Sequence, residues 1–285
     1  MEGKKLASVW VHLDQRSYPI FLDDNWNALF QEAFPYLNKN DSNQEGSLNG
    51  KKVLIVTDEN VYDLYHHSID EKLKAWGAKV STAVVSPGEA SKSLQQAEKL
   101  YTAALQANLD RHSMIVALGG GVIGDLAGFI ASTYMRGIPF IQVPTSLLAQ
   151  VDSSVGGKVA VNHPLAKNVI GAFYQPKCVL INVAVLKTLP NREFSTGMAE
   201  LIKHGIIRDE AFLTWLESHQ QAIAAQNSSI LARAIHRSCE IKADVVTKDE
   251  REAGLRAILD IPWVMPLKRL RDTVHLPTGK QFPWE

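Results

Sequence analysis

The sequence predicts an α/β amino-terminal domain with a Rossmann-like, mostly parallel sheet, followed by an all-helical carboxy-terminal domain. Short apolar runs typical of buried strands alternate with helical patterns up to about residue 188. One of these runs leads into three consecutive glycines, Gly119 to Gly121, after which helical spacing begins. Beyond Leu189-Pro190 only helical patterns with one charged face follow. We therefore expect an α/β domain over residues 1–188 and a helical domain from 189 to 260.

Composition limits the class of protein. The 285 residues include 30 basic and 30 acidic side chains, so no overall charge favours nucleic acid or a membrane surface. No apolar run is long enough to cross a bilayer, and Met1 to Leu6 do not resemble a secretory signal. Cys178 and Cys239 lack C-x-x-C spacing, which indicates core or surface thiols in a reducing compartment. We expect a cytoplasmic protein.

The elements follow from local patterns. Residues 9–13 and 18–22 form two β-type runs around a polar link, typical of a hairpin, and residues 38–52 form a solvated loop. Further strands are expected at residues 53–56, 79–85, 114–118, 140–143 and 178–183. Helices are expected after Asp58 up to Trp76, with Gly77 as the stop signal, and at residues 92–107, 194–207, 209–225 and 228–246. The alternating first part predicts βαβ units with helices on both faces of the sheet.

The glycine turn suggests a nucleotide site without proving one. Gly119 to Gly121 with Gly124 do not match the G-x-G-x-x-G spacing, and such turns also occur for packing reasons. If a dinucleotide binds here, glycines allow its phosphates to approach the backbone, and the new helix provides free N–H groups. Asp125, just inside that helix, could complement the helix dipole or hold a hydroxyl.

Polar residues also follow the neighbouring strands, where open α/β sheets bind their ligands. Asp58 ends the first buried strand, and Glu89 and Lys92 lie in the turn after the second. Asp58 could simply cap the next helix and Glu89 could be solvated, but successive carboxylates fit ribose hydroxyls better. The segment 143–158 adds Thr145, Ser146, Asp152 and Lys158, and turn formation alone does not explain so many polar groups between apolar anchors.

A second candidate site lies in the helical part. Glu200 and His204 are four residues apart, so one helix face can present a carboxylate and an imidazole to a metal ion. Glu200 and Lys203 are also within one turn, and an ordinary ion pair on a helix face is the alternative interpretation.

Taken together, these motifs resemble the 3-dehydroquinate synthase family. The matching segments are GGGVIGDLAGF (119–129), YMRG (134–137), the block 143–158, KNVIGAF (167–173), Leu189-Pro190 and MAELIK (198–203). They occur in family order across about residues 50–260. Glycerol-dehydrogenase-like enzymes share the glycine turn but lack this run of polar residues.

The resemblance implies an NAD-dependent lyase of the shikimate pathway, hence of chorismate and aromatic amino acid biosynthesis. The family converts 3-deoxy-D-arabino-heptulosonate 7-phosphate to 3-dehydroquinate and phosphate. NAD oxidises a carbinol and is regenerated, and a divalent metal, zinc or cobalt, polarises the hydroxyl that is oxidised. The family resemblance also implies a homodimer.

The resemblance assigns roles to residues of this chain. The implied NAD contacts are Asp58, Glu89, Lys92, Gly121, Val122, Ile123, Gly124, Asp125, Thr145, Ser146, Lys158, Lys167, Val185, Leu186, Lys187 and Thr188. The implied catalytic and substrate contacts are Arg136, Asp152, Lys158, Asn168, Lys203, Lys242 and Arg256. Arg and Lys side chains suit a phosphorylated sugar acid. Glu200 matches the carboxylate metal ligand.

The chain departs from the family pattern after about Asp260. The family places two histidine metal ligands here, in Gly-His-x-x-Gly-His and His-Gly-Glu-Ala motifs, and neither motif is present. Codons for Gly-His-Ala-Ile-Glu, read one base late, give Val-Met-Pro-Leu-Lys, which stands at residues 264–268. The same shift turns His-Gly-Glu-Ala-Val into Thr-Gly-Lys-Gln-Phe, residues 278–282, and His-Thr into Ile-Pro, residues 261–262, although Trp263 needs a base change.

We therefore hypothesise that residues 261–285 are an out-of-frame tail, so that the helical domain is incomplete. A genuine variant carboxy terminus is the alternative, and the coding DNA distinguishes the two. Glu200, with help from His204 or His275, would be a poor substitute for a three-ligand site. We expect weak or absent synthase activity and exposed apolar helix faces. A polyol dehydrogenase and a non-catalytic NAD- or sugar-phosphate-binding remnant are the competing functions.

Overall fold

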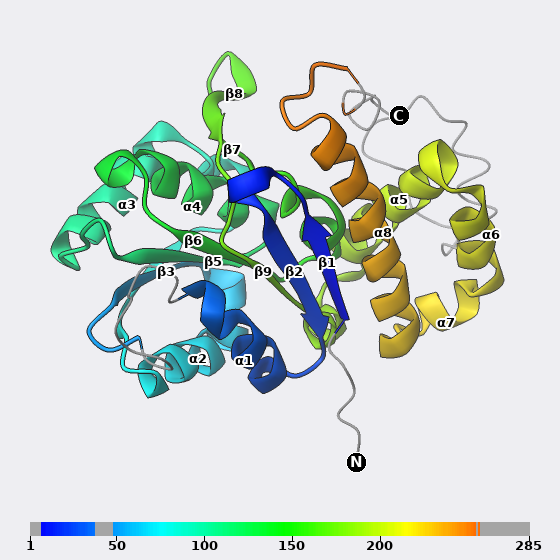
Figure 1. Cartoon of the computed structure of the whole chain (residues 1–285), viewed down its shortest axis with the longest axis horizontal. Coiled ribbons are helices and arrows are strands. Elements are labelled where there is room, and N and C mark those ends of the chain that lie inside the picture. The colour runs from blue at the N-terminus through cyan, green and yellow to red at the C-terminus, as the bar shows by residue number, and fades with distance from the viewer. Residues whose placement is uncertain (1–6, 38–47, 255, 257–285) are drawn as a thin grey trace.

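A seven-stranded sheet forms the centre of the computed structural model, which describes residues 7–37, 48–254 and 256 (Figure 1). Its strands are β1 (Ala7–Val11), β2 (Tyr18–Asp23), β3 (Lys52–Asp58), β4 (Lys79–Val85), β5 (Met114–Gly119), β6 (Phe140–Pro144) and β9 (Val179–Asn182). Their order is β1-β2-β9-β6-β5-β3-β4, and only the β1–β2 pair is antiparallel. The predicted hairpin and the mostly parallel sheet are both confirmed.

Helices cover both faces of this sheet. They are α1 (Trp26–Leu37) and α2 (Glu59–Ala75) on one face, and α3 (Leu94–Gln106) and α4 (Gly121–Thr133) on the other. Side chains alternate along β3, so that Val53 and Ile55 pack with the α1–α2 layer and Leu54 and Val56 pack with the α3–α4 layer. Both faces of a parallel strand are buried in this way, which explains the continuous apolar runs in the sequence.

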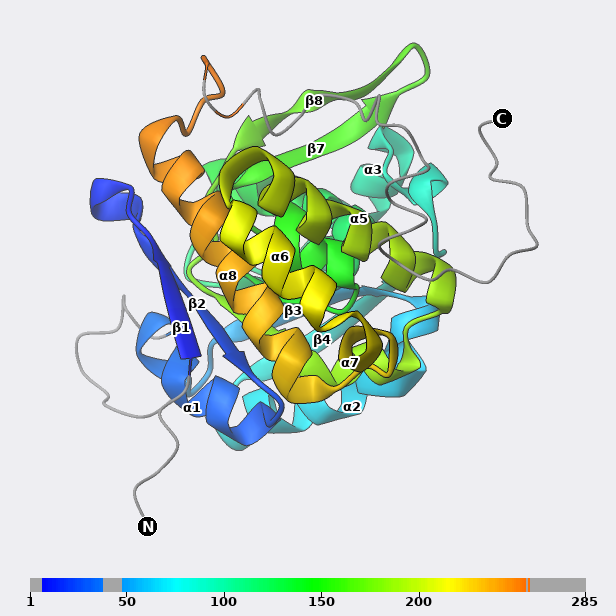
Figure 2. The ribbon, with the colours of Figure 1, turned by 90° about the vertical axis from the view of Figure 1, so that its right-hand side faces the viewer.

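The helical part packs directly against the β1–β2–β9 end of the sheet. Its helices are α5 (Asn191–Arg208), α6 (Glu210–Ser218), α7 (Gln220–Ala224) and α8 (Ser228–Lys248), and α8 runs beside β1 and β2 (Figure 2). One apolar cluster joins Ile20 and Ile181 of the sheet to Leu201 of α5 and Ile235 of α8. The core is therefore continuous across residue 188, while the predicted domain boundaries stay predictions. No helix within the described ranges is both long and apolar enough to cross a membrane.

The structure corrects several boundaries. The helix expected over 209–225 is two helices, because the backbone leaves helical geometry at His219. The helix expected from Lys92 begins at Leu94, since the Ser93 side chain accepts a hydrogen bond from the Gln96 N–H and so caps it. Helix α1, whose last turn contains Pro35, was not predicted from the sequence. Both cysteines are buried and unpaired, as expected of core thiols.

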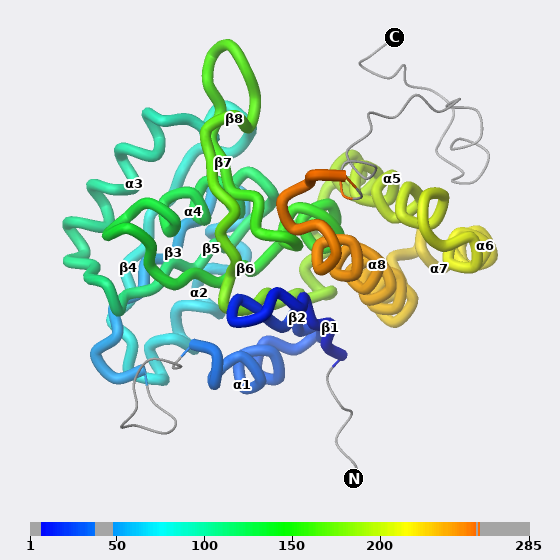
Figure 3. Tube along the Cα trace, turned by 45° about the horizontal axis from the view of Figure 1, so that its top comes forward, coloured from blue at the N-terminus to red at the C-terminus, as the bar shows by residue number. Residues whose placement is uncertain are grey.

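A two-stranded hairpin outside the main sheet was also not predicted. It pairs β7 (Lys158–His163) with β8 (Ala166–Phe173) and projects from the molecule beside α4 (Figure 3). Val159 and Val161 of β7 pack on the α4 layer. Almost every residue of β8 is exposed, so this strand lacks the alternation of apolar and polar residues that identifies a half-buried strand.

Close packing at Gly197 fixes the position of α5. A Cβ atom there would lie 2.5 Å from Leu147 Cβ and 2.7 Å from the backbone nitrogen of Leu148. We expect Gly197→Ala to lower the free energy of unfolding by about 1–3 kcal/mol, measured by urea denaturation, because α5 must move away. Gly254→Ala is the control, since a Cβ atom at Gly254 meets nothing within 4 Å. Equal stability of the two variants would contradict this prediction.

Candidate active site

A cavity of about 690 Å³ opens where the β7–β8 hairpin, the end of α8 and the residues after β6 meet. Six residues proposed from the sequence line it: Asp125, Asp152, Lys158, Asn168, Lys242 and Arg256. Glu252 also lines it and was missed by the sequence analysis, because a single glutamate in a charged loop carries no pattern. The cavity thus brings together charged residues from segments about 130 positions apart (125–256).

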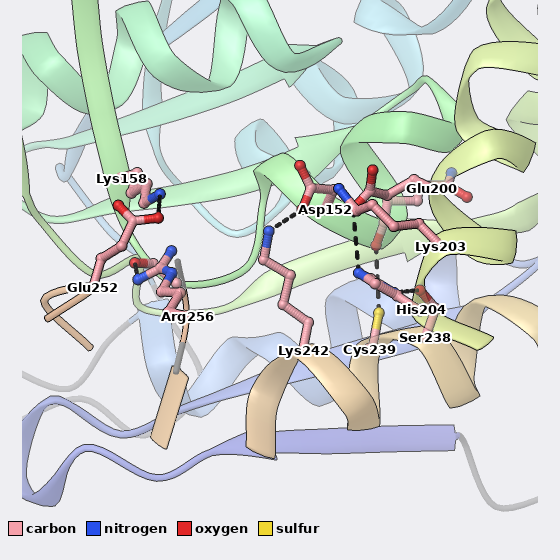
Figure 4. A network of polar contacts seen from close by, with 12 residues as sticks. Asp152, Lys158, Glu200, Lys203, His204, Ser238, Cys239, Lys242, Glu252 and Arg256 are labelled. Carbon is pink, nitrogen blue, oxygen red and sulfur yellow. Dashed lines mark hydrogen bonds and ion pairs between the residues drawn. The ribbon is translucent and has the colours of Figure 1, made fainter. Parts of the chain in front are cut away.

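The cationic side chains of this cavity are held by acceptors of the same chain (Figure 4). Lys242 of α8 forms an ion pair with Asp152, which lies in a helical turn at Ala149–Ser153. Lys158 Nζ lies 2.5 Å from Glu252 Oε1. Arg256 donates to the backbone oxygens of Gly156 at 3.1 Å and Glu250 at 2.7 Å. A bound anion would have to compete with these carboxylates for the lysines.

Asp152 is charged in this setting. Burial would raise the pKa of its carboxyl, but the ion pair and hydrogen bond with Lys242, together with His204 and Lys203, outweigh burial and hold the pKa below its usual range. The Asp152 carboxylate and the Lys242 ammonium therefore each keep the other charged in this partly buried position.

The glycine turn forms a cradle at the start of α4. Cβ atoms at Gly120 and Gly121 would lie 3.4 Å from Ser146 Oγ and 3.0 Å from Ser153 Oγ. No side chain in the described part of the chain caps α4, and the first N–H groups of a helix without a cap can bind an anion. At Gly124 glycine is required by packing, because a Cβ atom there would lie 2.8 Å from Gln142 Oε1. The turn needs glycine for close approach, since these glycines do not adopt the left-handed region.

The strand-end residues are already engaged with other groups. Asp58 accepts hydrogen bonds from the N–H groups of Asn60 and Val61 at 2.9 and 3.1 Å, so it does cap α2. The buried Lys92 pairs with Asp125 and donates to the side chain of Asn168. Lys92, Asp125 and Asn168 thus connect the loop after β4, helix α4 and the β7–β8 hairpin.

The pKa of Asp125 gives a test of this connection. Burial raises it to about 6, although Lys92 acts in the opposite direction. Because the pKa of Asp125 is higher in the folded protein than in the unfolded chain, the protonated carboxyl stabilises the folded state. This contribution to the free energy of unfolding is lost as the pH rises through about 6. Relative to Asp125→Asn, the wild type should lose roughly 2–3 kcal/mol of unfolding free energy between pH 4 and 7. Chemical denaturation at several pH values measures the difference, and parallel pH profiles would contradict it.

Other residues assigned from the family pattern lie apart from the cavity lining. Thr145 is buried at the end of β6, and Val185 and Leu186 are buried in the turn Val183–Thr188, whose Thr188 Oγ1 lies close to the Tyr65 hydroxyl. Lys187 lines a different hollow of about 600 Å³, together with Lys72. Lys167 is exposed on β8. Arg136 is exposed after α4 with φ +68° and does not line the 690 Å³ cavity.

Three side chains beside the cavity could hold a metal ion. One ligand atom each of Asp152, Glu200 and His204 lies within 4.8 Å of the others. Glu200 Oε1 and His204 Nε2 are buried and lie 3.3 Å apart, and Lys203 Nζ lies 2.6 Å from the same Glu200 oxygen. Among the described residues, His204 Nε2 has no hydrogen-bond partner. In a tetrahedral zinc site with ~2.1 Å bonds the ligand atoms are roughly 3.4 Å apart, so binding requires these side chains to close in by about an ångström. The residues present fit a site with three protein ligands.

The buried contact of His204 supports this fit. Its Nδ1 lies 2.6 Å from Ser238 Oγ, and its Nε2 lies 3.3 Å from Glu200 Oε1. If Nδ1 carries the proton and donates to Ser238, the lone pair of Nε2 faces Glu200 and Asp152, as metal-bound histidines require. From the sequence, Glu200 was predicted as a metal ligand and His204 as a possible additional ligand, whereas Asp152 was predicted only as a substrate contact. His275 lies outside the described residues.

Comparison with known proteins identifies the family of this chain. The sequence profile described as 3-dehydroquinate synthase N-terminal matches residues 82–196, and the profile described as 3-dehydroquinate synthase C-terminal matches residues 197–261. The 3-dehydroquinate synthase of Desulforamulus reducens is 52% identical over 255 residues, covering 90% of this chain and 68% of its own. The chain belongs to the 3-dehydroquinate synthase family. The enzyme of that name from Shewanella sp. is 49% identical over 253 residues, covering 89% of this chain and 67% of its own.

Solved structures extend the likeness of this 3-dehydroquinate synthase family member. A 2-deoxy-scyllo-inosose synthase complexed with carbaglucose-6-phosphate, NAD+ and Co2+ matches with a TM-score of 0.77 and 25% identity, covering 89% of this chain and 66% of that chain. The 2-epi-5-epi-valiolone synthase of Streptomyces hygroscopicus, with NAD+ and Zn2+ bound, matches with a TM-score of 0.74 and 24% identity, covering 87% and 66%, and shows the shared fold. The chain thus spans about two thirds of the length of these relatives.

Proposed function

We propose that this chain binds NAD and a divalent metal and acts on 3-deoxy-D-arabino-heptulosonate 7-phosphate, forming 3-dehydroquinate and releasing phosphate. The observation that carries the proposal is the cavity in which Lys158, Lys242 and Arg256 lie among Asp125, Asp152 and Asn168. A phosphorylated sugar acid carries several negative charges, and this cavity has the matching cations. Family membership supplies the reaction, and cobalt or zinc is the metal we expect, as in the solved relatives.

Each part of the site has a task in this reaction. Bound NAD would supply reversible hydride acceptance, and a bound divalent metal would supply Lewis-acid polarisation of the substrate hydroxyl. The N–H groups of the uncapped α4 terminus would hold the pyrophosphate, beside the hydroxyls of Ser146 and Ser153. Asp152, Glu200 and His204 would hold the metal. Arg256, buried and held by two carbonyls, would present its remaining N–H groups to the substrate.

Lysines would exchange partners when the substrate enters. In the structure Lys158 faces Glu252, Lys203 faces Glu200, and Lys242 faces Asp152. Metal binding at Glu200 and Asp152 would displace the ammonium groups of Lys203 and Lys242, which then become available to phosphate and carboxylate oxygens. The acidic residues would keep a counterion, because a bound metal would take the place of the two ammonium groups beside Glu200 and Asp152.

Two further properties belong to the proposal. Arg136 lies outside the cavity of its own chain. In a homodimer, a second copy could present this arginine to the substrate. Sedimentation analysis should then show a dimer, and a monomer with full substrate binding would exclude this role.

The second property is the compartment. Two buried, unpaired cysteines fit a reducing compartment, and we place the protein in the cytoplasm.

A phosphate-release assay tests the function. The chain is supplied with NAD, zinc and the heptulosonate phosphate, and compared with a version whose residues after Asp260 come from the next reading frame. We expect the second version to be faster by roughly 1,000-fold, because it regains the two histidine ligands of the family pattern, whereas the present chain would hold the metal with Asp152 and His204 beside Glu200. Equal activity in both would refute the out-of-frame tail, on which the described residues give no information.

Two other outcomes select the competing functions. NAD binding without phosphate release in either version would identify a non-catalytic binding protein. Net formation of NADH from glycerol would identify a polyol dehydrogenase, because the proposed reaction regenerates NAD within each turnover.

A further inference from the structure

Asn162, to which neither the sequence analysis nor the family pattern gave a role, joins two parts of the site. It lies on β7, half-buried, next to the loop that carries Glu89 and Lys92. Its side-chain amide group donates a hydrogen bond to Glu89 Oε1 at 2.7 Å. Its side-chain oxygen accepts a hydrogen bond from the Asn168 N–H at 2.9 Å. The nitrogen and the oxygen of the amide therefore each have a partner of the matching kind, an acceptor and a donor.

These contacts belong to a closed ring of three residues. The Asn162 N–H donates to the Lys92 carbonyl at 2.8 Å, and the Lys92 ammonium donates to the Asn168 side-chain oxygen at 2.5 Å. The Asn168 N–H closes the ring on Asn162. Asn168 has φ +60°, a left-handed conformation that asparagine adopts more readily than most residues with a Cβ atom. The side-chain oxygen of Asn162 holds the Asn168 N–H in this conformation.

We propose that Asn162 is a positioning residue that couples the cofactor side of the site to the substrate side. It holds the carboxylate of Glu89, which would otherwise be free to rotate on the surface, in the place where it can accept a hydrogen bond from NAD. Through the same amide it holds Asn168 toward the substrate cavity. This inference rests on the proposed function, because Glu89 is a cofactor contact only if the chain binds NAD.

Asn162→Asp separates the two halves of this role. An aspartate keeps the oxygen that accepts from Asn168 but places a negative charge against Glu89, where the structure has a hydrogen bond of 2.7 Å. We expect the dissociation constant for NAD, measured by calorimetry on the full chain, to rise about tenfold, the effect of losing one hydrogen bond to a charged group. Asn191→Asp makes the same chemical change at an exposed position of α5 and should leave the constant unchanged.

A double-mutant cycle distinguishes positioning from a general loss of structure. In the Glu89→Gln background the charge conflict is absent, so adding Asn162→Asp should change NAD affinity by less than about twofold. An equal tenfold loss in both backgrounds would overturn the proposal, as would an Asn162→Asp variant with wild-type NAD affinity. Asn162→Ser, which is uncharged but too short to reach Glu89, should weaken NAD binding about fivefold, and wild-type affinity there would also overturn the proposal. If the wild type itself binds no NAD, the proposed function fails instead.

Discussion

Replacing Glu200 with Gln is expected to weaken zinc or cobalt binding by more than about 100-fold, since even supporting residues of metal sites contribute 10–100-fold. The carboxylate is buried, with Oε1 2.6 Å from Lys203 Nζ and 3.3 Å from His204 Nε2. An amide keeps the shape but loses the charge that draws the cation. Calorimetric titration of the full chain with zinc, or the visible absorption of bound cobalt, measures the change.

The control and the alternative ligand set can be tested together. Glu217→Gln removes a charge from the exposed face of α6 and should leave metal affinity unchanged. Asp152→Asn and His204→Asn should each weaken binding if these side chains are ligands. If Glu200→Gln abolishes binding while the other two variants bind normally, the metal uses Glu200 with residues outside the group of three. Normal binding by Glu200→Gln would contradict the site altogether.

The second large effect is expected at the buried ion pair between α8 and the turn before β7. Lys242→Met leaves the Asp152 carboxylate without its ammonium partner, and the two side chains are only 7% and 29% exposed. Breaking such a pair from one side costs about 3–5 kcal/mol, because an unpaired charge stays buried. We expect a loss of about 3 kcal/mol in the free energy of unfolding, measured by urea denaturation without metal.

Two companion measurements show whether the unpaired Asp152 charge causes the loss of stability in Lys242→Met. The double variant Asp152→Asn with Lys242→Met should recover most of the loss, and zinc should reduce the loss in Lys242→Met because the cation neutralises Asp152. Lys248→Met, on the same helix, breaks an exposed pair with Asp244 and should cost less than about 1 kcal/mol. Similar losses of unfolding free energy for Lys242→Met and Lys248→Met would contradict the prediction that the buried Asp152–Lys242 pair contributes more than an exposed pair.

The sequence predicted most of the sheet because its strands are buried on both faces. Continuous apolar runs at β3, β5 and β6, separated by glycine and polar turns, indicate buried strands of a parallel sheet. The β8 strand could not be found in this way, since its side chains face solvent on both sides and its pairing with β7 is decided by register. The break between α6 and α7 was hidden because the helical pattern continues through His219.

The site was predicted unevenly for a similar reason. Sequence motifs and family likeness identified single residues such as Asp152, Lys242 and Glu200, each with one assigned role. Their pairing depends on where α5 and α8 cross the segment after β6, which no local pattern records. Glu252 and Asn162 were missed because their partners, Lys158 and Glu89, lie 94 and 73 positions away.

The sequence alone determined the α/β class, the glycine turn with its candidate nucleotide role, the family, and the departure from the family pattern after Asp260. These are local or collinear properties, readable from periodicity and motif order. Only the tertiary structure brought Asp152 beside Glu200 and His204, set each cavity lysine against a carboxylate, and placed Asn162 between Glu89 and Asn168. The physical reason is that charge and coordination act through space over a few ångströms, whereas the chain separates these groups by tens of residues.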